Sequence, residues 1–170
     1  MLLQFLLVLL ILGLGMYYSI RANKMNVPGA LSGGLLGMLV FLGAGFTGLA
    51  QLAFFFLAGS FVTVWKINYK VSLGLAEENK GRRTASQAWA NAGVAGLLGL
   101  CTWLGLIHSG LGALMIAASF AAATSDTFSS ELGNIYGRHY YNVLTLQPDT
   151  RGLNGVISLE GTFFGILGST

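Results

Sequence analysis

Long apolar runs with few charges between them limit the folds open to this chain more than any other feature. Of its 170 residues, 54% are hydrophobic, 9% are charged and 25 are glycine. A soluble domain has about 25% charged residues, so this chain has too few to cover a globular surface in water. Intrinsic disorder is excluded because it requires low hydrophobicity, and a single cysteine excludes a disulfide-stapled secreted domain. We therefore expect the chain to lie in a lipid bilayer.

The charged residues divide the chain into six apolar segments. A helix needs about 20 mainly apolar residues to cross the hydrocarbon core. The segments predict an all-α, multi-pass transmembrane bundle of about six helices, which forms a single integral membrane domain over residues 1–170 with loops at about 21–27, 66–87 and 126–152. The last segment stops at the final residue, so we expect the chain to be incomplete at its C-terminus. The segments are Leu2–Ile20, Pro28–Phe46, Gly48–Trp65, Ala88–Ile107, Leu111–Thr124 with a polar extension to Gly133, and Leu153–Thr170.

The basic residues predict the orientation of these segments. All 9 Lys and Arg residues lie in alternate gaps, so an external N-terminus would place every one of them on the same side. Lys and Arg are retained on the cytoplasmic side of membrane proteins. We therefore expect a multi-pass protein of the cell membrane whose active face is cytoplasmic. On this interpretation the net charge of +3 reflects topology, and we expect no nucleic-acid partner.

Two rows of glycine predict close helix packing. Gly29, Gly33 and Gly37 share one helix face, and a second row is formed by Gly93, Gly96 and Gly99. In lipid, burial of apolar surface does not drive helix association, and small residues instead let backbones approach closely. These rows indicate packing seams.

A first polar cluster occurs in GRRTASQAWANAG. Arg83, Gln87 and Asn91 are spaced four residues apart, so on a helix they form a stripe that drifts by about 40° per step. Amide side chains are costly in hydrocarbon unless they are paired. Two interpretations remain open: the amides join neighbouring helices while Arg83 reaches the headgroups, or the stripe lines a polar cavity open to the cytoplasm.

A second cluster, AAATSDTFSSELG, contains Asp126 and Glu131 after a long apolar run. Acidic residues within a membrane are expensive and are functional candidates by default, although carboxylates in water at a helix end are the alternative. On a straight helix a separation of five residues turns the two carboxylates about 140° apart, too far to share one metal ion. Either the helix loosens there, or the two acids have separate roles. Asp126 and Ser130 do share a face.

A third cluster, TRGLNGVISLEG, leads into the last segment. It combines Arg151 and Asn154 with glycines at a predicted helix start, where backbone amides can hold an anion. Glu160 lies further inside and needs a partner, which Arg151 or another cation can supply. The usual phosphate-loop, zinc and redox motifs (GxxxxGK[ST], HExxH and CxxC) are absent from the sequence.

Taken together, the three clusters resemble, in order and spacing, the domain of unknown function 92 family of multi-pass membrane proteins, which includes plant phytyl-phosphate kinase and transmembrane protein 19. NKMNVPGALSGGLLG is similar to that family's entry to its second span, and the resemblance covers most of Lys24–Thr170. The sequence departs from the family pattern at Asn154-Gly155-Val156, which has one glycine where many relatives have two, and at Glu160, where an apolar residue is expected.

The resemblance implies a kinase that converts an isoprenoid monophosphate to its diphosphate with a nucleoside triphosphate, CTP or ATP, and Mg²⁺. Phosphoryl transfer relies on alignment and charge neutralisation, which acidic and basic side chains supply. The expected catalytic residues are Asp126, Glu131 and Arg83, with Asp126 and Glu131 as the Mg²⁺ ligands. Residues expected to bind the lipid phosphate or the nucleotide are Lys80, Gln87, Asn91, Ser130, Arg151, Asn154 and Ser158.

Three alternatives remain beside the kinase. A lipid-phosphate cytidylyltransferase needs the same groups but forms a nucleotide-linked lipid and pyrophosphate. A transporter would use the intramembrane acids, although transporters place their sites near the midplane, whereas the polar residues here gather towards one interface. A structural or assembly protein would need neither phosphate-binding groups nor intramembrane acids.

Overall fold

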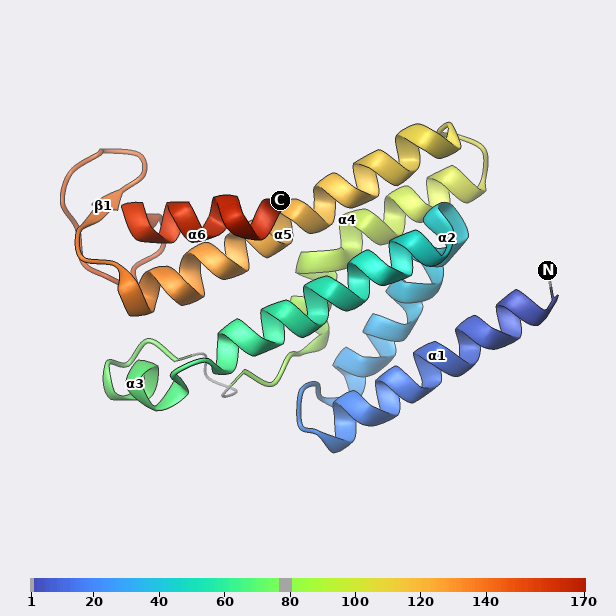
Figure 1. Ribbon diagram of the computed structural model, residues 1–170, viewed down its shortest axis with the longest axis horizontal. Coiled ribbons are helices and arrows are strands. Elements are labelled where there is room, and N and C mark those ends of the chain that lie inside the picture. The colour runs from blue at the N-terminus through green and yellow to red at the C-terminus, as the bar shows by residue number, and fades with distance from the viewer. Residues whose placement is uncertain (1, 77–80) are drawn as a thin grey trace. The chain divides into compact units, whose positions relative to one another are not determined.

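The computed structural model describes residues 2–76 and 81–170, and within them the chain forms six helices and one two-stranded sheet (Figure 1). The chain divides into two compact units, the first made of Met1–Phe54 and Arg82–Phe120 and the second of Phe55–Gly81 and Ala121–Thr170. The elements are α1 (Leu2–Arg21), α2 (Val27–Val64), α3 (Ile67–Ser72), α4 (Ala85–Trp103), α5 (Ser109–Tyr136), β1 (Tyr140–Asn142), β2 (Val156–Ser158) and α6 (Leu159–Ser169).

Within residues 2–76 and 81–170, three helices, α1, α2 and α5, are long and apolar enough to cross a membrane. The prediction of a mostly helical membrane protein is therefore confirmed, while the number and direction of crossings stay predictions. α2 has 38 residues and includes two predicted segments, because its backbone leaves helical geometry at Gly45, with φ of 60° and ψ of −150°. Such a positive φ favours glycine, which has no Cβ, and it lets the chain reverse there (Figure 1).

The last predicted segment, Leu153–Thr170, is not a single helix. It begins with a turn, continues into β2, and becomes helical only at Leu159. Gly152 and Gly155 adopt φ of 85° and 76°, which interrupts a right-handed helix. Tyr140 pairs with Ser158 and Asn142 with Val156 in the antiparallel register of β1 and β2. This small sheet corrects the expectation of an all-helical chain, because aromatic and β-branched residues favour strands.

Some glycines of the two predicted rows lie at close helix contacts in the first unit, whereas Gly33 and Gly93 meet only Met25 and Trp89. A Cβ on Gly99 would lie 2.2 Å from the carbonyl oxygen of Leu39, and one on Gly43 would lie 2.4 Å from Cα of Gly99. A Cβ on Gly37 would lie 2.7 Å from the side chain of Leu12 in α1. α4 and α1 therefore both approach α2 closely where glycine is present.

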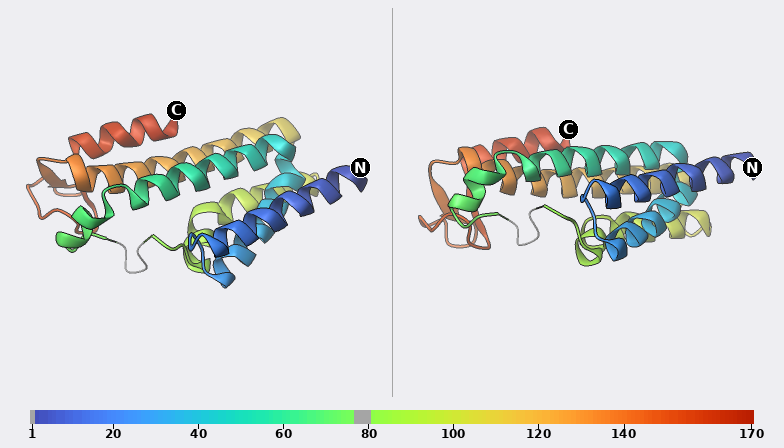
Figure 2. Two further views of the ribbon diagram at one scale, coloured as in Figure 1. Left: turned by 60° about the horizontal axis from the view of Figure 1, so that its bottom comes forward. Right: turned by 90° about the horizontal axis from the view of Figure 1, so that it is seen from below.

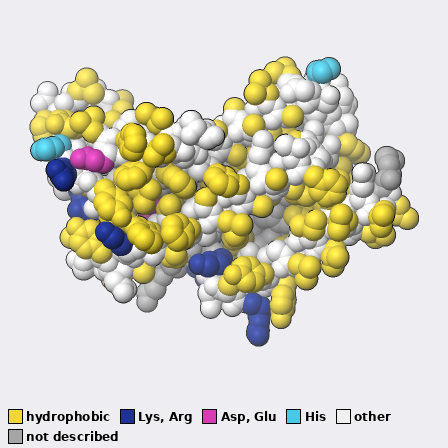
Figure 3. All heavy atoms as spheres, in the orientation of Figure 1, with side chains coloured by type: hydrophobic (Ala, Val, Ile, Leu, Met, Phe, Trp, Pro, Cys, Tyr) yellow, Lys and Arg dark blue, Asp and Glu magenta, His cyan; other side chains and the backbone are white. Residues whose placement is uncertain are grey.

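Apolar side chains face outward over much of the surface in view (Figure 3). In α1, only Val8 and Ser19 are buried, whereas Leu3 is 79% exposed. A helix that is apolar on all sides needs an apolar surrounding. These exposed faces are the expected surfaces for lipid contact.

In the second unit, α6 lies along the C-terminal half of α5 (Figure 2). Their closest approach is at Gly161, where a Cβ would lie 2.8 Å from the carbonyl oxygen of Ser129, and at Gly165, where it would lie 3.0 Å from Oγ of Ser125. This packing places the polar end of α5 beside the start of α6 and the β hairpin.

Candidate functional site

The predicted site residues are divided between the two units. The first unit contains Arg83, Gln87 and Asn91, and Lys80 lies outside the described residues. The second contains the remaining six, which are Asp126, Ser130, Glu131, Arg151, Asn154 and Ser158.

Arg83 does not belong to the helical stripe that its spacing predicts. It precedes Thr84, the N-cap of α4, and its backbone N–H donates to Lys24 at 2.8 Å while its carbonyl accepts from Asn26 at 3.0 Å. The Arg83 side chain is nevertheless buried, with 7% exposed. The stripe is therefore limited to Gln87 and Asn91, because a helix cannot include the extended residues that cap it.

Gln87 has a structural partner that its sequence context explains. Its backbone N–H donates to Oγ1 of Thr84, and its side-chain Oε1 accepts from the backbone N–H of Thr84 at 2.9 Å. This reciprocal arrangement is a capping box, which the pattern Thr-x-x-Gln typically forms at a helix start. The amide therefore satisfies the backbone at the beginning of α4.

Asp126 and Glu131 lie on α5, which stays helical to Tyr136. The helix does not loosen between them, so the separation of about 140° around its axis is kept. The Asp126 side chain is exposed. The Ser130 hydroxyl donates to the backbone carbonyl of Asp126 at 2.7 Å, as a serine one helical turn further along commonly does.

Glu131 forms an ion pair with Lys70 of α3. The Lys70 side chain is 1% exposed and that of Glu131 is 13% exposed. The Lys70 ammonium also donates to the carbonyls of Val62 and Thr63, in the last turn of α2. The last carbonyls of a helix lack partners within it, and a cation is favoured at that end. An ammonium has three protons, and here each has an acceptor.

The sequence prediction missed Lys70 as a site residue. The sequence pattern places Lys70 only among the basic residues of a loop, and the residue that neutralises it is 61 positions away. No local pattern connects residues so far apart. The one available indication was the charge itself, because a lysine beside an apolar span requires either water or a partner.

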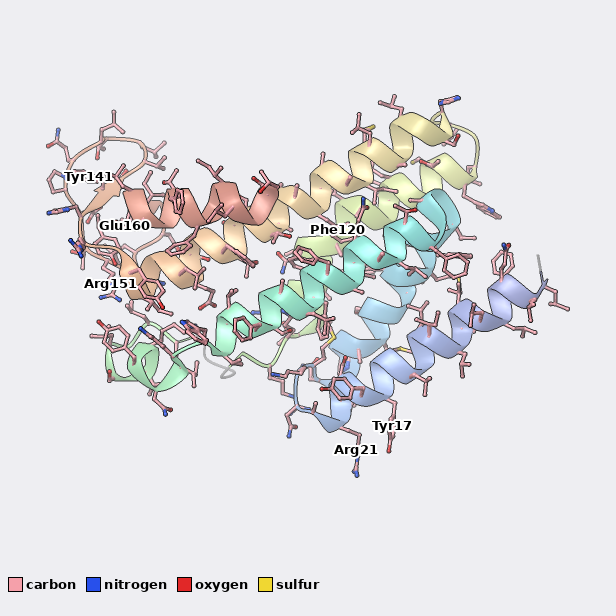
Figure 4. All side chains as sticks on the ribbon, viewed as in Figure 1. Tyr17, Arg21, Phe120, Tyr141, Arg151 and Glu160 are labelled. Atoms are coloured by element: carbon pink, nitrogen blue, oxygen red, sulfur yellow. The ribbon has the colours of Figure 1, made fainter. Side chains whose placement is uncertain are left out.

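Arg151 lies in the turn before β2 (Figure 4), and its guanidinium carbon lies over two aromatic rings. The distance to the ring centroid is 5.9 Å for Tyr69 of α3 and 5.7 Å for Tyr140 of β1. Nε and Nη2 of Arg151 are buried and have no hydrogen-bond acceptor within the described part of the chain. Glu160, the partner suggested by the sequence, instead accepts the backbone N–H of Arg138 at 3.4 Å.

Tyr140 and Ser158 fix the hairpin against the end of α5. The Tyr140 hydroxyl donates to the carbonyls of Gly133 and Gly137 at 2.9 and 3.0 Å. Burial raises the pKa of Tyr140 above its ordinary value, so the phenol stays protonated and can donate. Ser158 is the N-cap of α6, and its Oγ accepts the backbone N–H of Gly161 at 3.0 Å.

Asn154, a predicted site residue, is exposed in the turn before β2. Asp149 stabilises the outer part of the hairpin through two hydrogen bonds. The Asp149 carboxylate accepts from the backbone N–H of Thr150 at 2.7 Å and from the side-chain amide of Asn142 at 3.2 Å. These two hydrogen bonds favour the charged form and lower the pKa of Asp149.

Comparison with known proteins identifies relatives along most of the chain. Residues 9–170 match the family model "Integral membrane protein DUF92". The chain is 36% identical over 132 residues to the uncharacterized membrane protein sll0875 of Synechocystis, covering 77% of this chain and 51% of that protein. It is 34% identical over 151 residues to Protein VTE6, chloroplastic, of Arabidopsis thaliana, covering 85% and 44% respectively.

A third relative is the uncharacterized membrane protein MJ0933 of Methanocaldococcus jannaschii, 28% identical over 149 residues, covering 88% of this chain and 60% of that protein. The chain therefore spans about half the length of the curated relatives it matches. No solved structure matches it. The match over residues 9–170 agrees with the resemblance found in the three polar clusters, and the chain belongs to the DUF92 family of integral membrane proteins.

Proposed function

We propose that the chain is the part of a lipid-phosphate kinase that receives an isoprenoid monophosphate and, with a nucleoside triphosphate and Mg²⁺, converts it to the diphosphate. The observation that supports this most directly is its membership of the DUF92 family over residues 9–170, because the polar clusters resemble a family that includes plant phytyl-phosphate kinase. The apolar outer faces of α1, α2 and α5 suit a substrate with an isoprenoid tail.

The second unit contains both kinds of charge that phosphoryl transfer uses. Asp126 lies on α5, and Arg151 lies in the turn before β2. Phosphoryl transfer proceeds with little covalent participation by the protein, so positioning and neutralisation of phosphate charge are the main requirements. Acidic and basic side chains on neighbouring elements of one unit are consistent with that requirement.

The donor set fits Mg²⁺ at Asp126 better than at Glu131. Among residues 2–76 and 81–170, no group of three or more His, Cys, Asp or Glu side chains could hold a metal ion. Mg²⁺ does not need such a group, because it is commonly bound by one or two carboxylates together with substrate phosphates and water. Asp126 offers an exposed carboxylate, whereas Oε2 of Glu131 already accepts from Lys70. When bound, Mg²⁺ would neutralise phosphate oxygens.

Within this proposal the remaining residues have distinct tasks. Glu131 holds the Lys70 ammonium at the end of α2 and so positions α3 against α5. Among the described residues of the second unit, Arg151 has buried donors without an acceptor, and Arg83 and Lys80 stay proposed for the nucleotide phosphates. Ser130, Asn154 and Ser158 of the second unit, and Gln87 and Asn91 of the first, are proposed as hydrogen-bonding groups for the lipid phosphate or the nucleotide.

The test is direct measurement of the product. The purified chain in nanodiscs would be incubated with geranylgeranyl or phytyl monophosphate, Mg²⁺ and either CTP or ATP. We expect a prenyl diphosphate whose formation requires Mg²⁺ and falls at least about 100-fold in Asp126→Asn, as for the loss of one electrostatic group. Asp149→Asn is the matched control, since it removes the charge of an exposed carboxylate but keeps a side-chain oxygen that can accept from Thr150, so the rate should stay close to that of the wild type.

Two results would contradict the proposal. A nucleotide-linked lipid with released pyrophosphate would identify a cytidylyltransferase, and no product from any prenyl phosphate and nucleotide would remove the kinase assignment from this chain. Full activity in Asp126→Asn would keep the reaction but overturn the metal site.

A further inference from the structure

The guanidinium of Arg151 presents one complete hydrogen-bonding edge without an acceptor. Nε and Nη2 are both buried, and neither finds a partner within the described part of the chain. The N–H bonds of these two nitrogens run parallel, so this edge matches two oxygens of a single carboxylate or phosphate. A buried donor without an acceptor costs free energy, and two such donors on one edge indicate a bidentate ligand.

The surrounding residues hold the guanidinium in place without using that edge. The rings of Tyr69 and Tyr140 lie 5.9 and 5.7 Å from its central carbon, within the range of cation–π attraction. These ring contacts use neither Nε nor Nη2 as a hydrogen-bond donor, so both nitrogens remain available to another partner. Tyr140 is itself fixed, because its hydroxyl donates to Gly133 and Gly137 of the α5 end.

In the described part of the chain, the acidic side chains considered for Arg151 have other hydrogen-bond partners. Glu160 is near enough to act electrostatically on Tyr140, but its Oε2 accepts from the backbone of Arg138. Glu131 of α5 forms its ion pair with Lys70. Asp149, which precedes Arg151 by two residues, accepts from Thr150 and Asn142.

We infer that the Nε–Nη2 edge of Arg151 binds two oxygens of one phosphate group, with Tyr69 and Tyr140 as the positioning residues that fix the guanidinium. The choice of phosphate over carboxylate rests on the proposed function, whereas the two-oxygen geometry rests on the arginine alone. The phosphate belongs either to the lipid substrate or to the nucleotide. Tyr69 belongs to α3, an element absent from the sequence-based site, so the inference adds α3 to the proposed site.

The experiment measures binding without turnover. The chain would be purified in a maltoside detergent, which contains no phosphate, and titrated in one arm with geranylgeranyl monophosphate and in the other with CTP or ATP, each without Mg²⁺. Arg151→Gln removes the edge and the charge, whereas Arg151→Lys keeps the charge but cannot form two parallel hydrogen bonds. The matched control is Arg138→Gln, an exposed arginine of the same hairpin whose backbone N–H remains available to Glu160.

We expect Arg151→Gln to weaken binding about tenfold or more in one arm, the range for hydrogen bonds to a charged group. Arg151→Lys should recover only part of that affinity. Tyr69→Leu should weaken the same arm by about two- to fivefold through loss of the ring contact, and Arg138→Gln should stay within about twofold of the wild type. The arm that responds identifies the phosphate as that of the lipid or that of the nucleotide.

Unchanged affinity in both arms for Arg151→Gln, with its helical circular dichroism retained, would overturn the inference, as would a wild-type chain that binds neither probe. If Arg151→Gln fails to fold, the affinities of Arg151→Lys and Tyr69→Leu are compared with that of Arg138→Gln instead. Equal affinities for all three variants would overturn the inference. If the wild-type chain forms the product and Arg151→Gln binds phosphate normally, this inference is refuted and the proposed kinase is not. Arg151-dependent binding without any product would refute the proposed kinase and leave the phosphate site standing.

Discussion

The side chain of Lys70 is charged and yet almost fully buried. Its ammonium has three protons and three acceptors, namely two carbonyls at the end of α2 and the Glu131 carboxylate. Burial of a charge is costly unless it is both paired and hydrogen-bonded, and this arrangement meets both conditions. The same contact keeps Glu131 partly out of solvent, so the two residues depend on each other.

We expect Lys70→Met to lower the free energy of unfolding by about 3–5 kcal/mol, because it leaves a partly buried carboxylate without its cation. The measurement is denaturation of the chain in lipid nanodiscs. Lys66→Met is the matched control: Lys66 is exposed and lies 4.7 Å from the Tyr136 ring, so its loss should cost about 0.5–1 kcal/mol.

Replacing Glu131 by Gln in the Lys70→Met background should restore part of the lost stability, because the unpaired charge is then gone. A single Lys70→Met variant as stable as the Lys66→Met control would contradict the ion pair as a stabilising contact.

At the scale of elements, glycine decides which helix surfaces come together. α2 and α4 approach so closely that a Cβ on Gly99 would overlap the backbone of Leu39. Gly13 and Gly15 of α1, in contrast, have no neighbouring atom within 4 Å of an added Cβ. The presence of glycine in a membrane helix is therefore not enough to predict a close helix contact, since Gly13 and Gly15 have no such neighbour.

Gly99→Ala should therefore lower the thermal stability of the chain, with a cost of about 1–3 kcal/mol, because the atoms it would strike are backbone and cannot rotate away. Gly15→Ala tests the same chemical change at an open position, where the better helix propensity of alanine should leave stability unchanged or raise it by up to about 1 kcal/mol. Circular dichroism during heating measures both. Equal midpoints for the two variants would show that the α2–α4 seam is not tightly packed.

At the scale of the whole molecule, the orientation in the membrane is the expectation on which the cytoplasmic site depends. It follows from all 9 Lys and Arg residues falling in alternate gaps between apolar segments. Two exposed positions can test it: Ser72 in α3 and His108 just before α5. Gly81 is unsuitable for this purpose, because it is buried and has φ of 81°.

With Cys101 replaced by alanine, a cysteine at His108 should react with a membrane-impermeant maleimide added to intact cells. A cysteine at Ser72 should react only after the membrane is permeabilised. Labelling of Ser72→Cys from outside would reverse the orientation and place the basic residues, with the proposed site, on the external face.

Membrane embedding and family membership could be predicted from sequence, because composition, apolar run length and the three polar clusters are properties of the chain itself. The start of α4 was also encoded locally, in Thr84 and Gln87, although the spacing of Arg83 suggested one helical turn too many. The β hairpin was missed because two glycines with positive φ interrupt a segment that is otherwise apolar enough for a helix.

The sequence by itself determined that this chain belongs in a bilayer and that most of its apolar runs form helices. Only the tertiary structure decided which charges meet. Lys70 finds Glu131 across 61 residues, and Arg151 finds Tyr69 of α3. Local patterns record the conformation of neighbouring residues, whereas the pairing of a buried charge depends on which distant elements pack together. For this reason the sequence could name Arg151 only as a candidate, which stays a prediction, and it predicted Glu131 as a metal ligand, whereas in the fold Glu131 pairs with Lys70.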